Sequence, residues 1–216
     1  MTTNAFRENL IEKLGESNLQ KIETAEVGLA GAGGLGSNCA LNLVRVGFKN
    51  LTIVDFDIVA LSNLDRQFYF ADQIGIKKTE ALKINLLRIN PYLNLKMIDR
   101  KIEKTNIAEL FYDCAIVVEC FDRAEYKSML AAELLPLGKF IVSASGLGGI
   151  GHSDDIKIHK IKSNFIIVGD LKSDIAHAPA LSPRVNIAAA KQADVVLEFV
   201  ISRRNKLNRH LKNADF

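Results

Sequence analysis

Two amides and two cations that lie close together in the chain suit the binding of phosphate groups. Asn63, Arg66 and Gln67 lie within one short segment, and Lys78 follows at the start of an apolar-periodic stretch. Amide N–H groups and cationic side chains donate the hydrogen bonds that phosphate oxygens accept. A redox enzyme has little use for this cluster beside a nucleotide, whereas an enzyme that attacks a phosphate of ATP needs it. The residue types therefore favour ATP chemistry.

A glycine loop upstream of this cluster predicts where the nucleotide binds. Gly31, Gly33 and Gly36 fit the pattern GxGxxG, in which the first allows a tight turn, the second a close approach to phosphate and the third close helix–strand packing. Gly34 belongs to the same loop, and Asp55 follows at the distance from which a carboxylate reaches a ribose hydroxyl. The loop lacks the GK[ST] ending of a Walker-type phosphate loop. By itself it does not choose between NAD and ATP.

The elements that must position these residues alternate between strands and helices. An apolar stretch precedes the glycine loop, a helical period follows it, and the same order recurs along the chain. This alternation predicts an α/β fold: a Rossmann-like, doubly wound, mostly parallel sheet with helices on both faces. The expected strands are residues 26–30, 51–55, 93–98, 115–119 and 140–144, and the expected helices are residues 4–20, 37–46, 78–89, 124–135 and 184–200.

The composition of the chain changes after residue 145, where glycines become frequent. Residues 156–159 and 165–168 then predict the strands of a small antiparallel extension near the C-terminus. The polar stretch Gly169–Ser182 is a candidate loop over a bound substrate, and a plain connecting loop is an equal alternative. We therefore expect a single nucleotide-binding domain over residues 1–216. Its parts are an N-terminal helical segment (1–25), a Rossmann-like core (26–145), and a C-terminal part (146–216) with the extension, a crossover loop and a final helix.

Polar residues that follow different strands are expected to converge, because the carboxyl ends of parallel strands meet at one edge of a sheet. Arg66 and Lys78 follow the second expected strand and would neutralise a triphosphate, and Asp122 follows the strand 115–119. A carboxylate beside phosphates is a natural Mg²⁺ ligand. Taken singly, each residue has an ordinary alternative as a surface arginine or a helix-capping aspartate. Asp57 either caps its turn or assists the metal.

Composition indicates an ordinary globular protein without a nucleic-acid or membrane partner. Of its 216 residues, 48% are hydrophobic and 25% charged, and the net charge is only +3. The basic stretch 203–212 favours the polar end of a helix over a nucleic-acid contact. No uncharged run reaches the roughly 18 residues of a membrane-spanning helix. Cys39, Cys114 and Cys120 form no CxxC pair, so buried free thiols and a cytoplasmic location are expected.

Four stretches of the chain together resemble one known family. They are AGAGGLGS at residues 30–37, DFDIV at 55–59, SNLDRQ at 62–67 and INP at 89–91. They look like the ThiF/MoeB/HesA family, the bacterial relatives of ubiquitin-activating enzymes, and the likeness covers roughly residues 15–200. The short length and the Pro183–Arg184 start of the last helix look most like the compact ThiF branch linked to thiamine biosynthesis.

The resemblance implies an adenylyltransferase that uses ATP and Mg²⁺. Members of the family adenylate the C-terminal glycine of a small ubiquitin-like sulfur carrier that ends in Gly-Gly, and they are usually homodimers. The implied roles are ribose binding for Asp55, phosphate binding for Asn63, Arg66, Gln67 and Lys78, and Mg²⁺ binding for Asp122, with Arg66, Lys78 and Asp122 as the catalytic set. In the family an N-terminal arginine of one subunit reaches the other subunit's ATP, and Arg7 is the candidate here.

The chain departs from the family pattern in its cysteines. Longer members bind structural zinc through two CxxC pairs, which this sequence lacks, and residues 145–216 contain no cysteine for a covalent sulfur-transfer step. The sequence is therefore compatible with adenylation, but it lacks the cysteine that a persulfide or thioester step on this chain would need. Three alternatives stay open: an NAD-dependent oxidoreductase, a nucleotide-binding scaffold without turnover, and activation of a tRNA base carboxyl. The small positive charge gives the last one little support.

Overall fold

Short apolar strands form the centre of one twisted sheet. The computed structural model describes the backbone of residues 4–212 and the side chains of residues 4–202. Its seven strands have the order β3-β2-β1-β4-β5-β7-β6, and every neighbouring pair is parallel except β7 and β6. The central strands are continuous aliphatic runs because both faces of the sheet are covered. The strands are β1 (Glu26–Ala30), β2 (Asn50–Asp55), β3 (Asn94–Asp99), β4 (Ile116–Glu119), β5 (Phe140–Ala144), β6 (Lys157–Lys162) and β7 (Phe165–Gly169).

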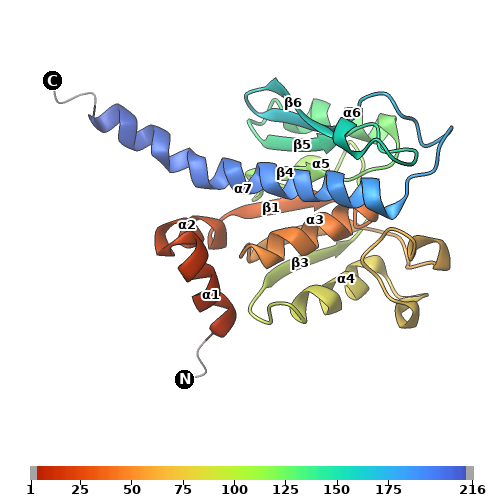
Figure 1. Ribbon diagram of the computed structural model, residues 1–216, viewed down its shortest axis with the longest axis horizontal. Coiled ribbons are helices and arrows are strands. Elements are labelled where there is room, and N and C mark those ends of the chain that lie inside the picture. Colours follow the sequence, from red (N-terminus) through yellow and green to blue (C-terminus); the bar gives the residue numbers. More distant parts are fainter. Residues whose placement is uncertain (1–3, 213–216) are drawn as a thin grey trace.

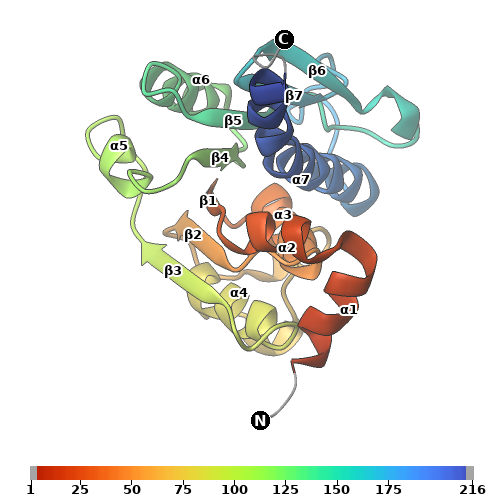
Figure 2. The ribbon, with the colours of Figure 1, turned by 90° about the vertical axis from the view of Figure 1, so that its left-hand side faces the viewer.

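Helices cover both faces of this sheet. Figures 1 and 2 show α3, α4 and α7 on one face and α5 and α6 on the other, with α3 and α7 side by side. The N-terminal helix α2 also packs against α7. The helices are α1 (Ala5–Leu14), α2 (Glu16–Glu23), α3 (Gly34–Arg45), α4 (Lys78–Leu87), α5 (Ile107–Leu110), α6 (Ala124–Leu134) and α7 (Ser182–Lys212), with short 3-10 turns at Leu61–Asn63, Ala71–Gln73 and Ser153–Asp155.

Each face of the sheet has its own apolar core. The core on the α3 side includes Leu43 and Val196, and the core on the α6 side includes Ile107 and Leu130. All four side chains are buried, so both layers contribute hydrophobic stabilisation to the sheet between them. This two-sided packing holds the strand ends in fixed relative positions.

The strand order reverses at β1, which lies between β2 and β4. The chain runs outward from β1 through β2 to β3 and then returns to β4 on the other side of β1. Loops that leave the carboxyl ends of β1 and β4 therefore diverge and open a crevice between them. Ligands of open α/β sheets bind at this kind of switch point.

The predicted α/β fold is confirmed, although the pairing of β7 and the bounds of several elements differ from the expectation. β7 joins the sheet parallel to β5, so only β6 is antiparallel; a two-residue turn reverses the chain between them. Helix α3 begins at Gly34, inside the glycine loop, and not at residue 37. Helix α7 runs through Lys212, so the stretch 203–212 is helical as expected, while the contacts of its side chains lie outside the described residues.

The cysteines behave as expected. Cys39, Cys114 and Cys120 are buried free thiols. Burial raises the pKa of the Cys39 thiol, which keeps it protonated and unreactive. None of the helices within residues 4–212 combines the length and apolar character that a bilayer-crossing segment needs.

Candidate functional site

The glycine loop has the conformation that its glycines predict. Gly31 has φ +109°, which a residue with a side chain rarely adopts. A Cβ at Gly36 would lie 1.9 Å from the Gly31 carbonyl oxygen, so α3 packs directly on the end of β1. Gly33 and Gly34 line the crevice, and the N-terminal amides of α3 start there. A helix N-terminus that faces a cavity favours an anion.

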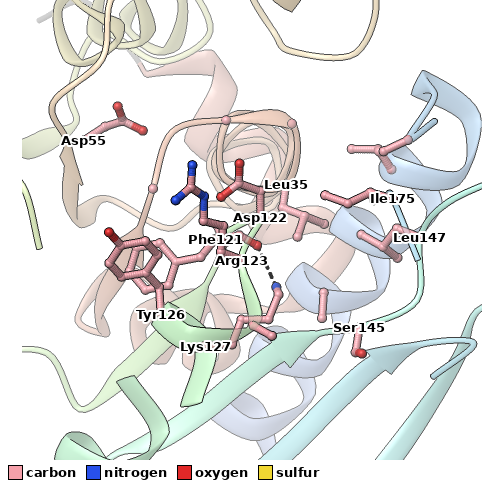
Figure 3. Close-up of a pocket in the computed structure, with 18 of the residues that line it drawn as sticks. Leu35, Asp55, Phe121, Asp122, Arg123, Tyr126, Lys127, Ser145, Leu147 and Ile175 are labelled. Carbon is pink, nitrogen blue, oxygen red and sulfur yellow. Dashed lines mark hydrogen bonds between the residues drawn. The ribbon is translucent and has the colours of Figure 1, made fainter. Parts of the chain in front are cut away.

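A cavity of about 940 Å³ occupies the crevice at the carboxyl ends of the strands. Its volume is in the range of small-molecule and cofactor sites. Figure 3 shows Asp55, Asp122 and Lys127 around the same hollow, from different elements. Seven cationic side chains line it against four aspartates, which favours an anionic ligand. The cations are Arg66, Lys78, Arg100, Lys101, Arg123, Lys127 and Lys172, and the aspartates are Asp55, Asp57, Asp122 and Asp174.

The segment around Arg66 is fastened to the glycine loop. The three hydrogen bonds that fasten it join Asn38 Nδ2 to the Arg66 carbonyl (2.9 Å), the Phe68 amide to Ser37 Oγ (3.0 Å), and Tyr69 Oη to the Ala32 carbonyl (2.7 Å). Burial raises the pKa of the Tyr69 hydroxyl, which therefore stays protonated as a donor. The two parts of the predicted site thus form one rigid unit.

Arg66 and Lys78 both line the cavity. Lys78 is nearly buried, with 7% of its side chain exposed, and its Nζ lies 2.7 Å from Asp57 Oδ2. Arg66 is 31% exposed and donates to Asp65 Oδ1 at 2.7 Å and to the Ser62 carbonyl at 2.9 Å. Both cations therefore belong to the cavity wall.

The remaining residues predicted on this side also reach the cavity. Asp55 ends β2, and its carboxylate accepts the Ala32 amide at 2.6 Å and the Asp57 amide at 2.8 Å, which orients it at the wall. Asn63 Oδ1 accepts the Ala60 amide at 2.9 Å. Gln67 Oε1 is buried without a hydrogen-bond partner. A buried acceptor of this kind is costly unless a ligand or water satisfies it.

Asp122 lies on the opposite wall, just after β4 and before α6. Its side chain is exposed to the cavity. Within residues 4–202, no three His, Cys, Asp or Glu side chains gather as ligands for a metal ion. A lone carboxylate still fits Mg²⁺, which takes one or two carboxylates and completes its shell with phosphate oxygens and water.

Sequence reasoning missed part of the second wall. Arg123, Tyr126 and Lys127 belong to the start of α6 and line the cavity beside Asp122. Asp122 was predicted because segments that follow the carboxyl ends of parallel strands converge. The same argument applies to the first turn of the helix after β4, so these residues could have been predicted from the sequence. Arg100 and Lys101 follow β3 and reach the cavity for the same reason.

The loop between β7 and α7, within the stretch Gly169–Ser182, forms a third wall of the cavity. Asp170 is its anchor: it accepts the amides of Lys172 and Ser173 at 2.8 Å each and pairs with Arg184 Nη2 at 2.5 Å. Arg184 is buried and also donates to the carbonyls of Leu147, Gly151 and His152. One buried arginine therefore joins this loop to the segment after β5.

Arg7 has its partners within the chain. Its guanidinium donates to Glu23 at 3.0 Å and to Glu16 at 2.6 Å. Lys49 binds the same Glu23 carboxylate at 2.7 Å. These contacts pair the Arg7 guanidinium with carboxylates of its own chain.

Comparison with known proteins places the chain in a family. The family model described as "ThiF family" matches residues 6–216. The molybdopterin-synthase adenylyltransferase of Haemophilus influenzae is 34% identical over 125 residues, which are 57% of this chain and 51% of that protein. The adenylyltransferase and sulfurtransferase UBA4 of Eremothecium gossypii is 35% identical over 138 residues, 63% of this chain and 31% of that protein. The chain thus spans about half or less of the length of these curated relatives.

Solved structures share the fold. The E. coli tRNA N6-threonylcarbamoyladenosine dehydratase TcdA, solved in complex with ATP, matches with a TM-score of 0.80 and 21% identity. The match covers 97% of this chain and 99% of the TcdA chain. At that identity the likeness concerns the architecture.

Proposed function

We propose that this chain, which belongs to the ThiF family, is an adenylyltransferase that uses ATP to activate the C-terminal carboxylate of a small ubiquitin-like carrier protein. The adenylyltransferase names of the relatives support this reaction. So does the ATP complex of the similarly folded TcdA.

The observation that carries the proposal is the composition of the single cavity at the sheet switch point. The glycine loop, Asp55, the two cations Arg66 and Lys78, and Asp122 all line it. They come from segments that follow different strands, and the fold brings them to one edge. A purely structural glycine turn has no need of cations on one side and a solvent-facing carboxylate on the other.

Different residues of the cavity are assigned to the phosphates and to the ribose of the nucleotide. Gly31, Gly33 and Gly34 line the cavity at the start of α3, Gly33 leaves room there for phosphates, and Gly36 allows the packing that shapes the loop. Asp55 accepts ribose hydroxyls with the lone pairs that its two amide contacts leave available. Asn63 and Gln67 supply amide groups beside Arg66.

The reaction is attack of the carrier carboxylate on the α-phosphorus of ATP. A C–O–P bond forms, the bond between the α-phosphorus and the bridging oxygen breaks, and pyrophosphate leaves. The carboxylate is ionised at neutral pH, so no general base is needed. The barrier is repulsion between two anions together with positioning, and Arg66 and Lys78 lower it by stabilising negative charge in a preorganised site. Asp122 would hold Mg²⁺, which would supply further charge neutralisation.

The carrier must present an extended tail to reach the cavity, which favours a flexible Gly-Gly end. The loop Gly169–Ser182, anchored through Asp170 and Arg184, is the wall that covers this tail. The Pro183–Arg184 start of α7 favours a ThiS-like carrier in thiamine biosynthesis, acted on by a homodimer in the cytoplasm. These finer assignments rest on the family resemblance.

Exchange of labelled pyrophosphate into ATP tests the proposal. Purified protein with Mg-ATP and a carrier ending in Gly-Gly should catalyse exchange, and a carrier whose terminal glycines are deleted should not support it. Comparing ThiS-like with other sulfur carriers tests the pathway. Binding of ATP without exchange on any of several carriers would indicate a scaffold and contradict the enzyme.

A further inference from the structure

Glu119 is a buried charge beside the cavity. It is the last residue of β4, and its side chain is fully buried. A buried carboxylate is destabilising unless it is paired and hydrogen-bonded. Its partners are Lys127 Nζ (3.1 and 3.2 Å), the Phe121 amide (2.6 Å) and the Ser143 hydroxyl. Both carboxylate oxygens of Glu119 are therefore hydrogen-bonded, and Glu119 and Lys127 form an ion pair. Neither the family resemblance nor the position of residues after strand ends predicted a role for Glu119.

The pair holds Phe121 through the two peptide groups on either side of its Cα. Glu119 Oε1 accepts the Phe121 N–H, and Lys127 Nζ donates to the Phe121 carbonyl at 2.6 Å. Figure 3 shows Lys127 reaching back from α6 toward Phe121, with Asp122 next to it. We call this arrangement the Glu119–Lys127 clamp. Because the clamped carbonyl belongs to the peptide unit that leads into Asp122, the clamp fixes the direction in which Asp122 leaves the strand.

Two other elements hold the clamp in place. Ser143, on the neighbouring strand β5, donates to the second oxygen of Glu119. Gln192, on α7, donates to the Glu119 carbonyl at 3.0 Å. Lys127 is 21% exposed and Glu119 is not exposed at all, so the clamp is anchored in the interior and ends at the cavity wall.

We propose that Glu119 and Lys127 are positioning residues that aim the Asp122 carboxylate at the metal-bound phosphates. The inference rests on the proposed function, because it gives Asp122 its Mg²⁺ role. A carboxylate in a loop loses conformational freedom when it binds a metal, and a preset loop removes part of that entropy before the metal arrives. Groups that orient metal ligands typically change metal affinity or activity by about 10–100-fold when mutated.

Equilibrium binding of ATP tests this without relying on turnover. Isothermal titration of the full chain with ATP, once with Mg²⁺ and once with EDTA, yields the factor by which Mg²⁺ improves ATP affinity. Asp122→Asn defines complete loss of that factor. Glu119→Gln keeps the size and one acceptor oxygen of Glu119 but removes the charge that holds Lys127. Lys127→Met removes the ammonium group that binds Glu119 and the Phe121 carbonyl. Glu133→Gln, on the same helix and partnered with Lys104 at 3.6 Å, is the matched control.

The expected result is a drop of about tenfold or more in the Mg²⁺ factor for Glu119→Gln and Lys127→Met, toward the Asp122→Asn value. Affinity for ATP in EDTA should stay within about twofold of wild type for Glu119→Gln, which leaves Lys127 in the cavity wall, and Glu133→Gln should match wild type throughout. The double variant should bind Mg-ATP no more weakly than the poorer single variant, because both changes release the same residue, Phe121.

Other outcomes overturn the inference. An unchanged Mg²⁺ factor in folded Glu119→Gln means that the pair is only structural. Weaker ATP binding in EDTA for Lys127→Met alone means that Lys127 contacts the nucleotide itself. If Glu119→Gln does not fold, Ser143→Ala, which removes one Glu119 contact, must still lower the Mg²⁺ factor. A wild-type chain that binds no ATP removes the proposed function and this inference together, whereas normal wild-type binding with unaffected variants removes only the inference.

Discussion

Asp57 and Lys78 are joined twice: Lys78 Nζ lies 2.7 Å from Asp57 Oδ2, and the Lys78 amide donates to the Asp57 carbonyl at 2.9 Å. Both residues line the cavity. The structure thus gives Asp57 a third role, distinct from turn cap or metal ligand. It holds the lysine at the cavity wall in the absence of a competing anion.

Lys78→Met should reduce pyrophosphate exchange by about 100-fold or more, because a charge that stabilises the transition state is lost from a preorganised site. The neighbouring Lys77→Met is the control. Lys77 is half exposed and pairs with Asp99 at 2.6 Å, outside the cavity lining, so its loss should change exchange by less than about twofold. Equal losses in both variants would show that general surface charge matters rather than the position of Lys78.

Arg66→Ala should abolish measurable exchange, a loss of about 100-fold or more, while circular dichroism and the melting temperature stay close to wild type. The fold survives because the contacts that fasten this segment to the glycine loop use the Arg66 carbonyl and not its guanidinium. Arg45→Ala, at the exposed end of α3, should leave exchange intact. A fully active Arg66→Ala would remove Arg66 from the site.

Gly33 and Gly36 should fail in different ways when a methyl group is added. A Cβ at Gly33 meets nothing closer than Gln67 Nε2 at 3.9 Å, so Gly33→Ala should fold normally and lose ATP affinity, since the methyl occupies phosphate space. A Cβ at Gly36 would lie 1.9 Å from a backbone oxygen, so Gly36→Ala should lower the free energy of unfolding by about 1–3 kcal/mol or more. Denaturant titration and ATP binding separate the two effects, and a stable Gly36→Ala that binds ATP would contradict this reading of the loop.

The stabilising effect of Asp170 should depend on pH. Burial alone would raise the pKa of this carboxyl, but hydrogen bonds from the amides of Ser173 and Lys172 and the charge of Arg184 outweigh it and hold the pKa below its ordinary value. The unfolded chain therefore protonates Asp170 at a higher pH than the folded chain does. The stabilisation is present in full above the ordinary pKa of about 3.9 and disappears as the pH falls through the lower folded pKa.

Asp170→Asn should consequently be less stable than wild type near neutral pH, and the difference should shrink as the pH is lowered below about 4. Urea titrations across this range measure it. The exposed Asp72→Asn serves as the control and should show a small difference at every pH. A gap between wild type and Asp170→Asn that widens on acidification would contradict the assigned direction.

Mg-ATP should stabilise the protein against heat and NAD should not. A ligand at 100 times its Kd adds about 2.7 kcal/mol to the free energy of unfolding, which raises Tm by roughly 5–10 °C for a chain of this size. The cations beside the glycine loop match a triphosphate better than a dinucleotide. Stabilisation by NAD alone would revive the oxidoreductase alternative, for which the glycine loop and Asp55 serve equally well.

The sequence alone predicted the residues at the proposed nucleotide end of the site. The glycine loop, Asp55 and the Asn63–Lys78 cluster follow strands that local apolar periodicity predicts, and β1 and β5 have the expected bounds. These features are local, because a turn, a cap and a strand depend on residues within a few positions of one another. The rule that parallel strand ends converge then placed Asp122 at the same cavity.

The tertiary structure alone decided which charges pair. Glu119 meets Ser143 and Gln192, which lie 24 and 73 positions away, and Asp170 meets Arg184 across 14 positions. Such contacts depend on sheet order, register and helix packing, none of which is written in the spacing of residues. For the same reason only the structure shows that Asp57 holds Lys78, and that Arg7 binds Glu16 and Glu23 of its own chain.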